Sequence, residues 1–536
     1  MLDEEIHWVL RNARMHAADP RLRSATGFAA GGGVAPAVHR SQIGRWETGK
    51  AEVNHGLVRR YEVVLGLPEG QLLCAIDYLS RDRAPVRSTA TLHPKEPPEL
   101  GYVQLLLERA LSTHPMRGVH WDHLSSALGS LPDALIRERD WERLLRRCTQ
   151  EMAVSVGLEF GLRDEAAARL AGHPRSGPLV AAAARATLQD PSAQIYSDAV
   201  GLLQYSDHPA AAAVLFEQLA HPTNSDALSA ALFCLTTVIR SGRAGPEAQR
   251  KVAHLALSHL RERGHPFRVH RAAAHLLRAL RLPGVARIAT GLTAEDHRYA
   301  VSILLEERAT AGEALRATQA RVRSSLTEAF GSADGQEPVL RRLVTTATAT
   351  TDDESRSNAL AVLMLSPQGR VLGSTYAAEL EAALQRGDHV AAHESLSVLT
   401  WVTQPEDLDL LVGLLLDPGT PAQIVMEAAI AAGNCREQRS AAAGAREQLV
   451  FTAAVAGVRA APAARDDTAS SEPLRQRLRG LVYFLGMRGR LDLVAALGSA
   501  VDAAGSHGQV CRGVVDWWLR LPPEVRALLE EDSAEL

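Results

Sequence analysis

The sequence predicts an all-α protein in which a few short helices precede a long succession of helix pairs. Two observations indicate this fold. Ala- and Leu-rich segments with helical spacing follow one another from about residue 99 to residue 521, and no stretch alternates with a period of two. Breaks before proline recur roughly every 13 to 25 residues, the length of one helix and its turn, so helix pairs should repeat roughly every 30 to 45 residues.

The composition and charge of the chain limit the functions that are open to it. Of its 536 residues, 46% are hydrophobic and 22% are charged, which is ample for large buried cores and excludes a disordered protein. The 58 basic and 62 acidic side chains give a net charge of −4. The whole surface therefore cannot coat a nucleic acid, and any such contact must be local.

The cysteines and the apolar segments predict a soluble protein of the cytoplasm. The five cysteines lie roughly 70 or more residues apart and form no CxxC pair, which excludes a zinc ribbon and a dense disulfide framework. The acidic, amphipathic N-terminus is unlike a signal peptide. The most apolar short stretch, Leu410 to Leu416, is far shorter than a membrane-spanning helix, so we expect no membrane contact.

The first 81 residues predict about five short helices, which we take as an N-terminal domain, 1–81. Gly49 and Gly66 each follow a predicted helix, in the position where glycine commonly ends one. The predicted elements are a helix over 4–18, a Gly-rich stretch at 27–33 in which the second helix should fall, a helix over about 39–48, a helix over 57–65, and a last helix from Pro68 to Leu79.

Three further segments complete the predicted organisation. Residues 82–98 contain four prolines and almost no apolar periodicity, which is typical of a linker. Residues 99–521 form the long helical-repeat domain. Residues 522–536 carry five carboxylates and one arginine, and we expect this acidic C-terminal tail to be frayed.

The helical-repeat domain shows its pattern most clearly in two units. One begins at Pro209, with an apolar helix, the turn PTNSD and an Ala-rich helix, and the other begins at Glu406. Over roughly residues 170–440 this pattern resembles HEAT-like α-solenoids. The resemblance implies stacked helix pairs with an extended groove.

The most specific string in the sequence runs from Val38 to Lys50 and reads VHRSQIGRWETGK. It resembles the recognition helix of XRE-type, lambda-repressor/Cro-like helix-turn-helix domains. The segment from Leu10 to Arg14 resembles the first helix of that family, and the segment from Leu57 to Leu73 resembles its fourth and fifth helices. The resemblance covers about residues 4–80 and implies that the helix at 39–48 enters the major groove of duplex DNA.

The residues of this helix support a DNA contact independently. Ile43 and Trp46, three residues apart, form an apolar edge that can hold the helix on a small core. Between Arg21 and Arg60, seven basic residues accompany only two acidic ones, a local net charge of +5 in an acidic protein. The candidate DNA-binding residues are His39, Arg40, Ser41, Gln42, Arg45 and Lys50.

Glu47 requires a separate explanation, because a carboxylate on a DNA-facing helix would repel phosphates. In the family that the sequence resembles, this glutamate pairs with an arginine of the first helix, and the matching position here is Arg14. The resemblance therefore implies a structural pair of Arg14 and Glu47. One departure accompanies it: from Leu10 to Val38 the chain is about eight residues longer than the usual spacing. Either the turn before the recognition helix carries an insertion, or the second helix is short.

A second basic segment extends from Arg250 to Arg287, where nine basic residues accompany Glu262 alone. One interpretation is a solvated face in an arginine-rich protein. The other is a contact for phosphates, for an acidic partner, or for the acidic tail of the chain itself. The candidate residues of this second patch are Arg261, Arg263, Arg268, Arg271, Arg278 and Arg281.

No pattern in the sequence indicates an enzyme, a cofactor or a metal. The segment from Gly44 to Lys50 has the spacing of a phosphate-binding loop, but Ala51 stands where Ser or Thr would hold magnesium. His389 and His393 lie four apart without a clear third ligand, and solvated roles are more common for such pairs. No GxSxG nucleophile motif is present.

We therefore expect a cytoplasmic regulator of transcription that binds double-stranded DNA through the helix at 39–48. Because one such domain reads only about four or five base pairs, the mechanism implies a homodimer on a palindromic site. The helical-repeat domain would serve dimerisation, or the binding of a protein, peptide or small-molecule effector. The alternatives are an interaction scaffold tethered to DNA, and a receptor with its ligand in the solenoid groove.

Overall fold

Helices account for all the regular structure that the computed structural model describes. The all-α prediction is confirmed, because the described ranges contain α-helices and short 3-10 helices and no strand. None of the described helices is both long enough and apolar enough to cross a bilayer. The described residues are 2–81, 90–94, 98–131, 133–189, 193, 197–280, 293–331, 337–349, 353–460, 468–504 and 509–531.

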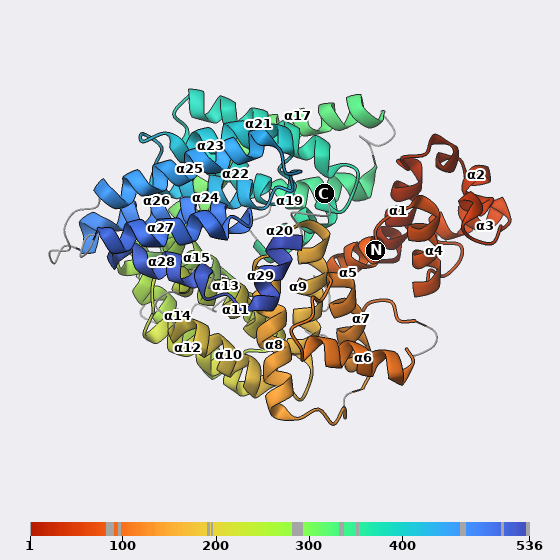
Figure 1. Cartoon of the computed structure of the whole chain (residues 1–536), viewed down its shortest axis with the longest axis horizontal. Helices are drawn as coiled ribbons and strands as arrows, with labels where there is room; N and C mark the ends of the chain where they lie inside the picture. Colours follow the sequence, from red (N-terminus) through yellow and green to blue (C-terminus); the bar gives the residue numbers. More distant parts are fainter. Residues whose placement is uncertain are drawn as a thin grey trace.

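Five short α-helices form the N-terminal part of the molecule, at one side of the structure (Figure 1). Two one-turn 3-10 helices, Pro20–Arg23 and Gly31–Gly33, lie between the first three of them. The helices are α1 (Leu2–Met15), α2 (Ala25–Ala29), α3 (Arg40–Glu47), α4 (His55–Leu65) and α5 (Gln71–Arg81).

Three local features define the start of α4 and the boundary between α4 and α5. The side chain of Asn54 accepts a hydrogen bond from the Leu57 amide and caps the start of α4. Gly66 ends α4 in a left-handed conformation, with φ of 64°, which glycine adopts without steric cost. The buried carboxylate of Glu62 then accepts hydrogen bonds from the Gly70 and Leu72 amides, at 3.1 and 2.8 Å. Glu62 thereby satisfies free amides at the start of α5.

Between α1 and α3 the chain forms a short second helix and additional 3-10 turns. Helix α2 has only five residues, and the 3-10 turn after it has positive φ angles at Gly31, Gly32 and Gly33. Side chains other than glycine rarely adopt this conformation, which explains the glycine-rich stretch. Beyond this turn, the guanidinium of Arg60 donates to the carbonyl of Pro36 and holds the segment that leads into α3.

The helices that follow occupy the rest of the molecule. The predicted unit at Pro209 is present as α12 and α13, and the unit at Glu406 as α23 and α24. In the first half the helices are α6 (Leu100–Ala110), α7 (Gly118–Gly129), α8 (Glu138–Ala153), α9 (Gly157–Gly172), α10 (Gly177–Gln189), α11 (Ser197–Gly201), α12 (Pro209–Ala220), α13 (Ser225–Arg240), α14 (Pro246–Arg261) and α15 (Phe267–Ala279).

In the second half the helices are α17 (Ala294–Phe330), α19 (Pro338–Ala349), α20 (Asp353–Met364), α21 (Gly369–Gln385), α22 (His389–Val402), α23 (Leu408–Leu416), α24 (Ala422–Gly433), α25 (Ala441–Ala460), α26 (Thr468–Met487), α27 (Leu491–Ala503), α28 (Gln509–Leu519) and α29 (Pro523–Glu531).

These helices alternate between two layers. Helices α20, α22, α24, α26 and α28 pack against one another in succession, while α23, α25 and α27 form a second layer over them. Consecutive helices, such as α23 and α24, also pack against each other. The layers curve around a central space, with the early helices along one side and the late helices along the other (Figure 1).

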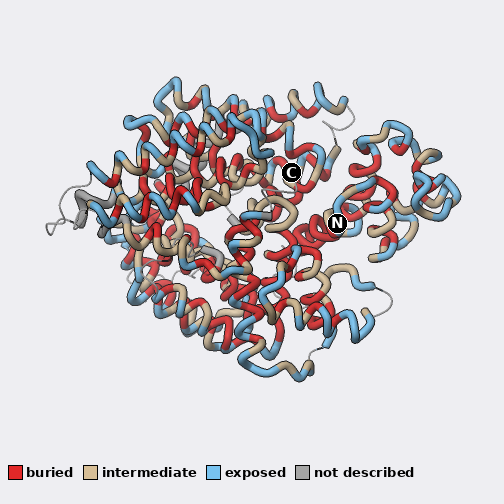
Figure 2. The backbone as a smooth tube through the Cα atoms, in the orientation of Figure 1, coloured by how far each residue is buried: buried red, intermediate tan, exposed pale blue. Residues whose placement is uncertain are grey.

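Helix α5 joins the N-terminal helices to this curved assembly. It packs against α9 on one side and α20 on the other, and every residue from Leu72 to Arg81 is buried (Figure 2). Asp77 and Arg169, 92 positions apart, form a buried ion pair at 2.6 Å. Arg81 lies 2.7 Å from Glu165. Residue 81 thus ends a helix but does not separate two independently packed bodies.

Parts of the predicted linker and tail are ordered by contacts with helices. Within 82–98 only residues 90–94 and 98 lie among the described residues, and there the Thr91 amide donates to Asp77 at 2.7 Å. The expectation of a frayed tail is wrong for α29, because its Val525 and Leu529 are buried and the helix packs against α8. Their four-residue spacing gives α29 an apolar face despite its carboxylates.

The buried pair of Asp77 and Arg169 yields a test of this packing. Asp77→Ala leaves a buried guanidinium without one of its carboxylates, so we expect a loss of about 3–5 kcal/mol in the free energy of unfolding of the full chain. Glu406→Ala is the control, because its ion pair with Arg370 is exposed and should contribute about 0–1 kcal/mol. Denaturant unfolding followed by circular dichroism measures both, and equal effects would contradict the role of α5.

Candidate nucleic-acid interface

Helix α3 presents one polar face to solvent and one apolar face to the N-terminal core. Ile43 is fully buried and Trp46 is partly buried against the same core, so this pair anchors the helix. On the opposite face Gly44 has no side chain. The space beside it is open, because a Cβ added there would meet no other atom within 4 Å. The exposed residues of this face are Arg40, Ser41, Gly44, Arg45 and Thr48.

The start of α3 is capped by a side chain from the candidate site itself. His39 precedes the helix in an extended conformation, and its Nδ1 accepts a hydrogen bond from the Ser41 amide at 3.3 Å. The same Nδ1 lies 2.7 Å from the hydroxyl of Ser41. His39 and Ser41 are therefore held together at the N-terminal end of the exposed face, while Gln42 is half-buried beside them.

The other end of α3 is fixed by a buried ion pair. Arg14 of α1 donates to both carboxylate oxygens of Glu47, from Nε at 2.6 Å and from Nη2 at 2.7 Å. The Tyr61 hydroxyl of α4 donates to the same carboxylate at 3.0 Å. The exposed fractions of Glu47 and Arg14 are only 5% and 8%, so Glu47 faces away from solvent and from any ligand of the exposed face.

The electrostatics of this cluster favour the charged pair. Burial alone would lower the pKa of the Arg14 guanidinium, but the hydrogen bonds and charge of Glu47 raise it instead. Burial and the adjacent Glu47 carboxylate raise the pKa of Tyr61, so its phenol stays protonated and remains a hydrogen-bond donor. Three helices thus meet at one bidentate ion pair, which sets the orientation of α3.

The basic residues around α3 divide into two groups. Arg21 pairs with Asp19, Arg59 pairs with Glu62 and Glu69, and Arg23 donates to the Ala17 carbonyl. By contrast, none of the residues that the structure describes forms an ion pair or a hydrogen bond with the side chains of Arg40, Arg45 or Lys50. The positive charge at α3 is therefore not neutralised by described neighbours.

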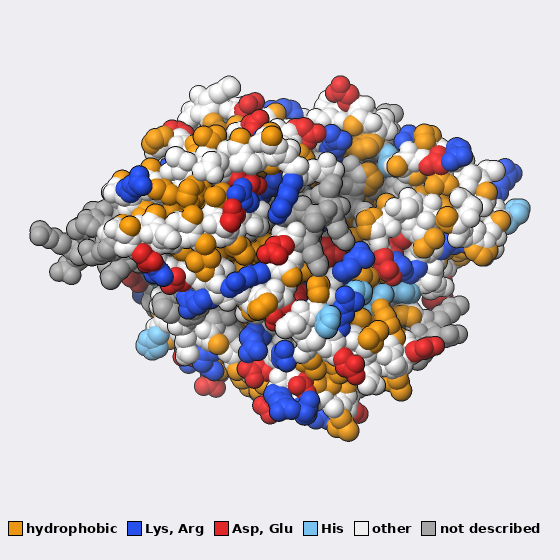
Figure 3. Space-filling view, in the orientation of Figure 1, with side chains coloured by type: hydrophobic (Ala, Val, Ile, Leu, Met, Phe, Trp, Pro, Cys, Tyr) orange, Lys and Arg blue, Asp and Glu red, His pale blue; other side chains and the backbone are white. Residues whose placement is uncertain are grey.

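Helix α3 lies at the outer edge of the molecule. Figure 1 shows α2 and α3 at the far end of the N-terminal helices, away from the curved assembly. In Figure 3 basic side chains and a histidine lie along this outer rim. The exposed face is therefore accessible to a large, rigid partner.

The second basic segment does not form one free basic surface. Arg261 pairs with Asp296 at 2.6 Å, and the guanidinium of Arg263 lies 3.7 Å from the centre of the Tyr299 ring. Arg268 pairs with Asp226 at 2.5 Å. Arg271 lines the central cavity, Arg278 is exposed at the end of α15, and Arg281 lies outside the described residues.

The central space contains a cavity that the sequence did not indicate. Its volume is about 1150 Å³, and α5, α9, α13, α15, α20, α22, α24 and α26 all contribute to its wall. Among the described lining residues, seven arginines accompany four carboxylates, and tyrosine and tryptophan side chains lie between them. Burial alone would raise the pKa of the Asp226 carboxyl, but Arg268 and Arg479 lower it. Arg81 and Arg370 also pair with Glu165 and Glu406, which lie just outside the lining, so these seven arginines are nearly balanced by carboxylates.

Two groups of histidine and glutamate side chains lie elsewhere in the structure, away from α3. His393 lies 2.6 Å from Glu427 of the neighbouring helix, which gives this histidine a carboxylate partner. His259, Glu262 and His265 lie close together at the end of α14, a grouping that sequence reasoning missed. Their H-x-x-E-x-x-H spacing was the signal, but it becomes meaningful only when the end of the helix at Arg261 is known.

A buried Glu47 and a Glu47 that contacts DNA predict opposite effects of its substitution on stability and DNA binding. Glu47→Ala leaves Arg14 buried without its partner, so we expect the stability of the N-terminal helices to fall by about 3–5 kcal/mol. The exposed Glu52→Ala removes the same charge nearby and serves as the control. Thermal unfolding of the full-length variants measures the difference. Unchanged melting together with tighter DNA binding would place Glu47 at the interface instead.

No family model, no curated protein and no solved structure matches this chain.

Proposed function

We propose that this protein is a transcriptional regulator that binds double-stranded DNA sequence-specifically, with α3 as the helix that enters the major groove. The observation that carries this proposal is the exposed face of α3, where Arg40 and Arg45 have no described intramolecular partner. This face belongs to a helix that Arg14 and Glu47 hold in place. The resemblance of the segment to XRE-type recognition helices supports the same proposal.

The chemistry of the exposed face suits a duplex. A guanidinium can donate two hydrogen bonds to the O6 and N7 atoms of guanine, so Arg40 and Arg45 are the candidate readers of base sequence. Ser41 and Gln42 lie near the start of α3, where the helix dipole favours phosphate. His39 and Lys50 flank the helix on the two sides and are candidate phosphate contacts. The bare surface at Gly44 allows the DNA to approach the helix closely.

The size of α3 has a consequence for assembly. A helix of eight residues reads only about four or five base pairs, which is too few for a specific genomic site. We infer that two copies of the chain bind a palindromic operator as a homodimer. The long stack of helix pairs, which we interpret as a HEAT-like solenoid, offers surface for such an interface.

The central cavity favours a second function within the same regulator, the binding of an effector. Tyr78 and Arg81 belong to α5, the last of the N-terminal helices, and both lie in the cavity wall. A ligand in the cavity would therefore touch the element that connects α3 and its neighbours to the helical repeats. The seven guanidinium groups in the wall can donate hydrogen bonds to the acceptor groups of a ligand such as an acidic peptide or a phosphorylated metabolite.

Substitution of the two arginines on α3 tests DNA reading. We expect Arg40→Ala and Arg45→Ala each to weaken binding to the selected operator by about 1–3 kcal/mol, with little change on random duplex, because each loses contacts to a base edge. Selection of bound sequences from a random pool supplies the operator, and titration by fluorescence anisotropy at fixed salt measures affinity.

The control for net charge is Arg439→Ala, an exposed arginine that is remote in sequence from α3. It should leave operator binding unchanged. Equal losses on operator and random DNA would make Arg40 and Arg45 phosphate contacts. Weak, sequence-indifferent binding by the unmodified protein would favour a scaffold that DNA merely tethers.

The effector function is tested at the cavity wall. We expect acidic peptides or phosphorylated metabolites from a thermal-shift screen to raise the melting temperature of the full chain, and Arg271→Gln to reduce that rise. Arg271 is half-buried at the cavity, whereas Arg250 is exposed on α14 outside it, so Arg250→Gln is the matched control. If both variants respond like the unmodified protein, the ligand binds elsewhere.

A further inference from the structure

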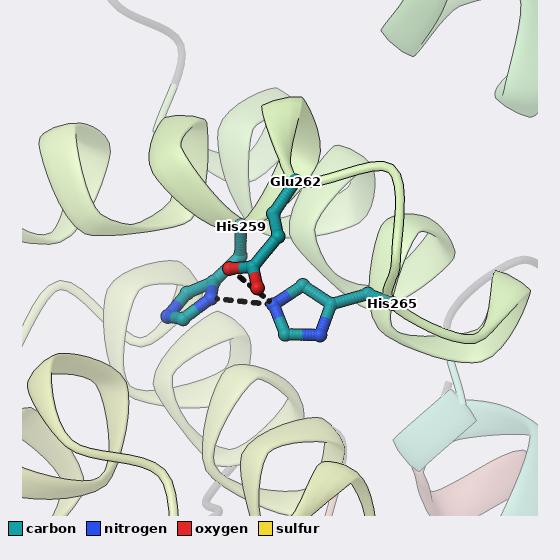
Figure 4. A group of neighbouring side chains, drawn as sticks. All are labelled: His259, Glu262 and His265. Atoms are coloured by element: carbon teal, nitrogen blue, oxygen red, sulfur yellow. Dashed lines mark hydrogen bonds and ion pairs between the residues drawn. The ribbon is translucent and has the colours of Figure 1, made fainter. Parts of the chain in front are cut away.

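Three side chains converge where α14 ends and the chain turns toward α15. His259 lies in the last turn of α14, Glu262 follows the helix, and His265 lies in the turn before α15 (Figure 4). The Glu262 carboxylate lies beside both imidazole rings in this view. One ligand atom from each residue lies within 4.8 Å of the other two. This grouping is separate from α3 and does not depend on the proposed DNA binding.

The hydrogen bonds around His259 fix which of its nitrogens carries a lone pair. Its Nε2 lies 2.7 Å from the carbonyl oxygen of Leu219. A carbonyl oxygen only accepts hydrogen bonds, so Nε2 must carry the proton. In the neutral ring the lone pair is then on Nδ1, which points at His265 Nε2 at 3.1 Å. A backbone carbonyl that holds the far nitrogen in this way is typical of histidines that bind metals.

His265 cannot satisfy both of its neighbours with one proton. Its Nε2 lies 3.1 Å from His259 Nδ1 and also 3.1 Å from the carboxylate of Glu262. Both neighbouring atoms are hydrogen-bond acceptors, and a single N–H points well toward only one of them. A cation between the three atoms would accept a lone pair from each.

The spacing and the ligand types fit a tetrahedral ion. Zinc ligands about 2.0–2.1 Å from the metal are separated from one another by about 3.4 Å in a tetrahedron, so the observed 3.1 Å contacts need only small shifts. Two imidazoles and a carboxylate form a known zinc ligand set, in which water takes the fourth position. Glu262 has 64% of its side chain exposed, which leaves that position open to solvent.

The neighbouring cations do not rule out a metal at this place. Arg261 is neutralised by Asp296, and Arg263 lies over the ring of Tyr299. His270 lies 2.9 Å from the Glu262 carbonyl through its Nε2, so this nitrogen also donates to a backbone oxygen and is not a free ligand. The local positive charge is therefore directed to other partners.

We propose that His259, Glu262 and His265 form a binding site for a divalent transition-metal ion, with zinc as the best fit. The ion would join the last turn of α14 to the turn that precedes α15. Arg268 and Arg271 of α15 line the central cavity, so the metal would also fix the helix that carries these two arginines.

Zinc titration of the full-length protein, stripped of metal with a chelator, tests the site. We expect one zinc ion per chain by calorimetry, and a loss of affinity of at least about tenfold in His265→Gln and in Glu262→Gln. With Co²⁺ in place of zinc, the unmodified protein should show the intense visible absorption of tetrahedral cobalt. Both substituted residues are partly exposed, so circular dichroism should show an unchanged fold.

The matched control is His254→Gln, which changes an exposed histidine on the same helix. It should bind zinc as tightly as the unmodified protein. The proposal is overturned if the unmodified chain binds no zinc, or if His265→Gln and Glu262→Gln bind it with unchanged affinity and stoichiometry. Equal losses in all three variants would show adventitious binding by surface histidines, which also overturns it.

Discussion

The charges buried along α5 are the constraint on which the arrangement of the molecule depends. Asp77 and Arg81 sit on a helix that is covered on both sides, and a buried charge is tolerated only with a well-placed partner. Their partners, Arg169 and Glu165, both come from α9. Because such pairs are costly to break, the N-terminal helices occupy one position against α9. Arg81 also borders the cavity, so this constraint and the proposed effector site share a residue.

A buried charge with a well-placed partner also fixes α3. Arg14, Glu47 and Tyr61 come from three helices and satisfy one another away from solvent, which leaves the outer face of α3 free of acidic side chains. A net-acidic protein thus presents a local positive surface. The attraction of such a surface for a polyanion weakens as salt rises, whereas contacts to base edges depend less on salt. Affinity and specificity would therefore come from different atoms of one short helix.

Local features of the fold could be predicted from the sequence, and distant contacts could not. The helix at 39–48, its terminal glycine and the helix pair at Pro209 were visible because capping and periodicity involve neighbouring residues. The pairing of Arg14 with Glu47 came from a family resemblance. The cavity was not visible, because its wall collects residues from many helices that lie far apart in the sequence. The apolar face of α29 was masked by carboxylates, since three buried residues among nine give a weak signal.

The contact between α29 and α8 links a late helix to an early one. In an open stack each unit touches only its neighbours, so the stack can change curvature like a spring and can unravel from its ends. In the solenoid that we propose, the contact of α29 with α8 would join the last described helix to one of the first and close the stack on itself. A closed loop resists changes in curvature, and its terminal units cannot separate without breaking that contact. The repeats would then unfold cooperatively, and the width of the central space would be set by the closure.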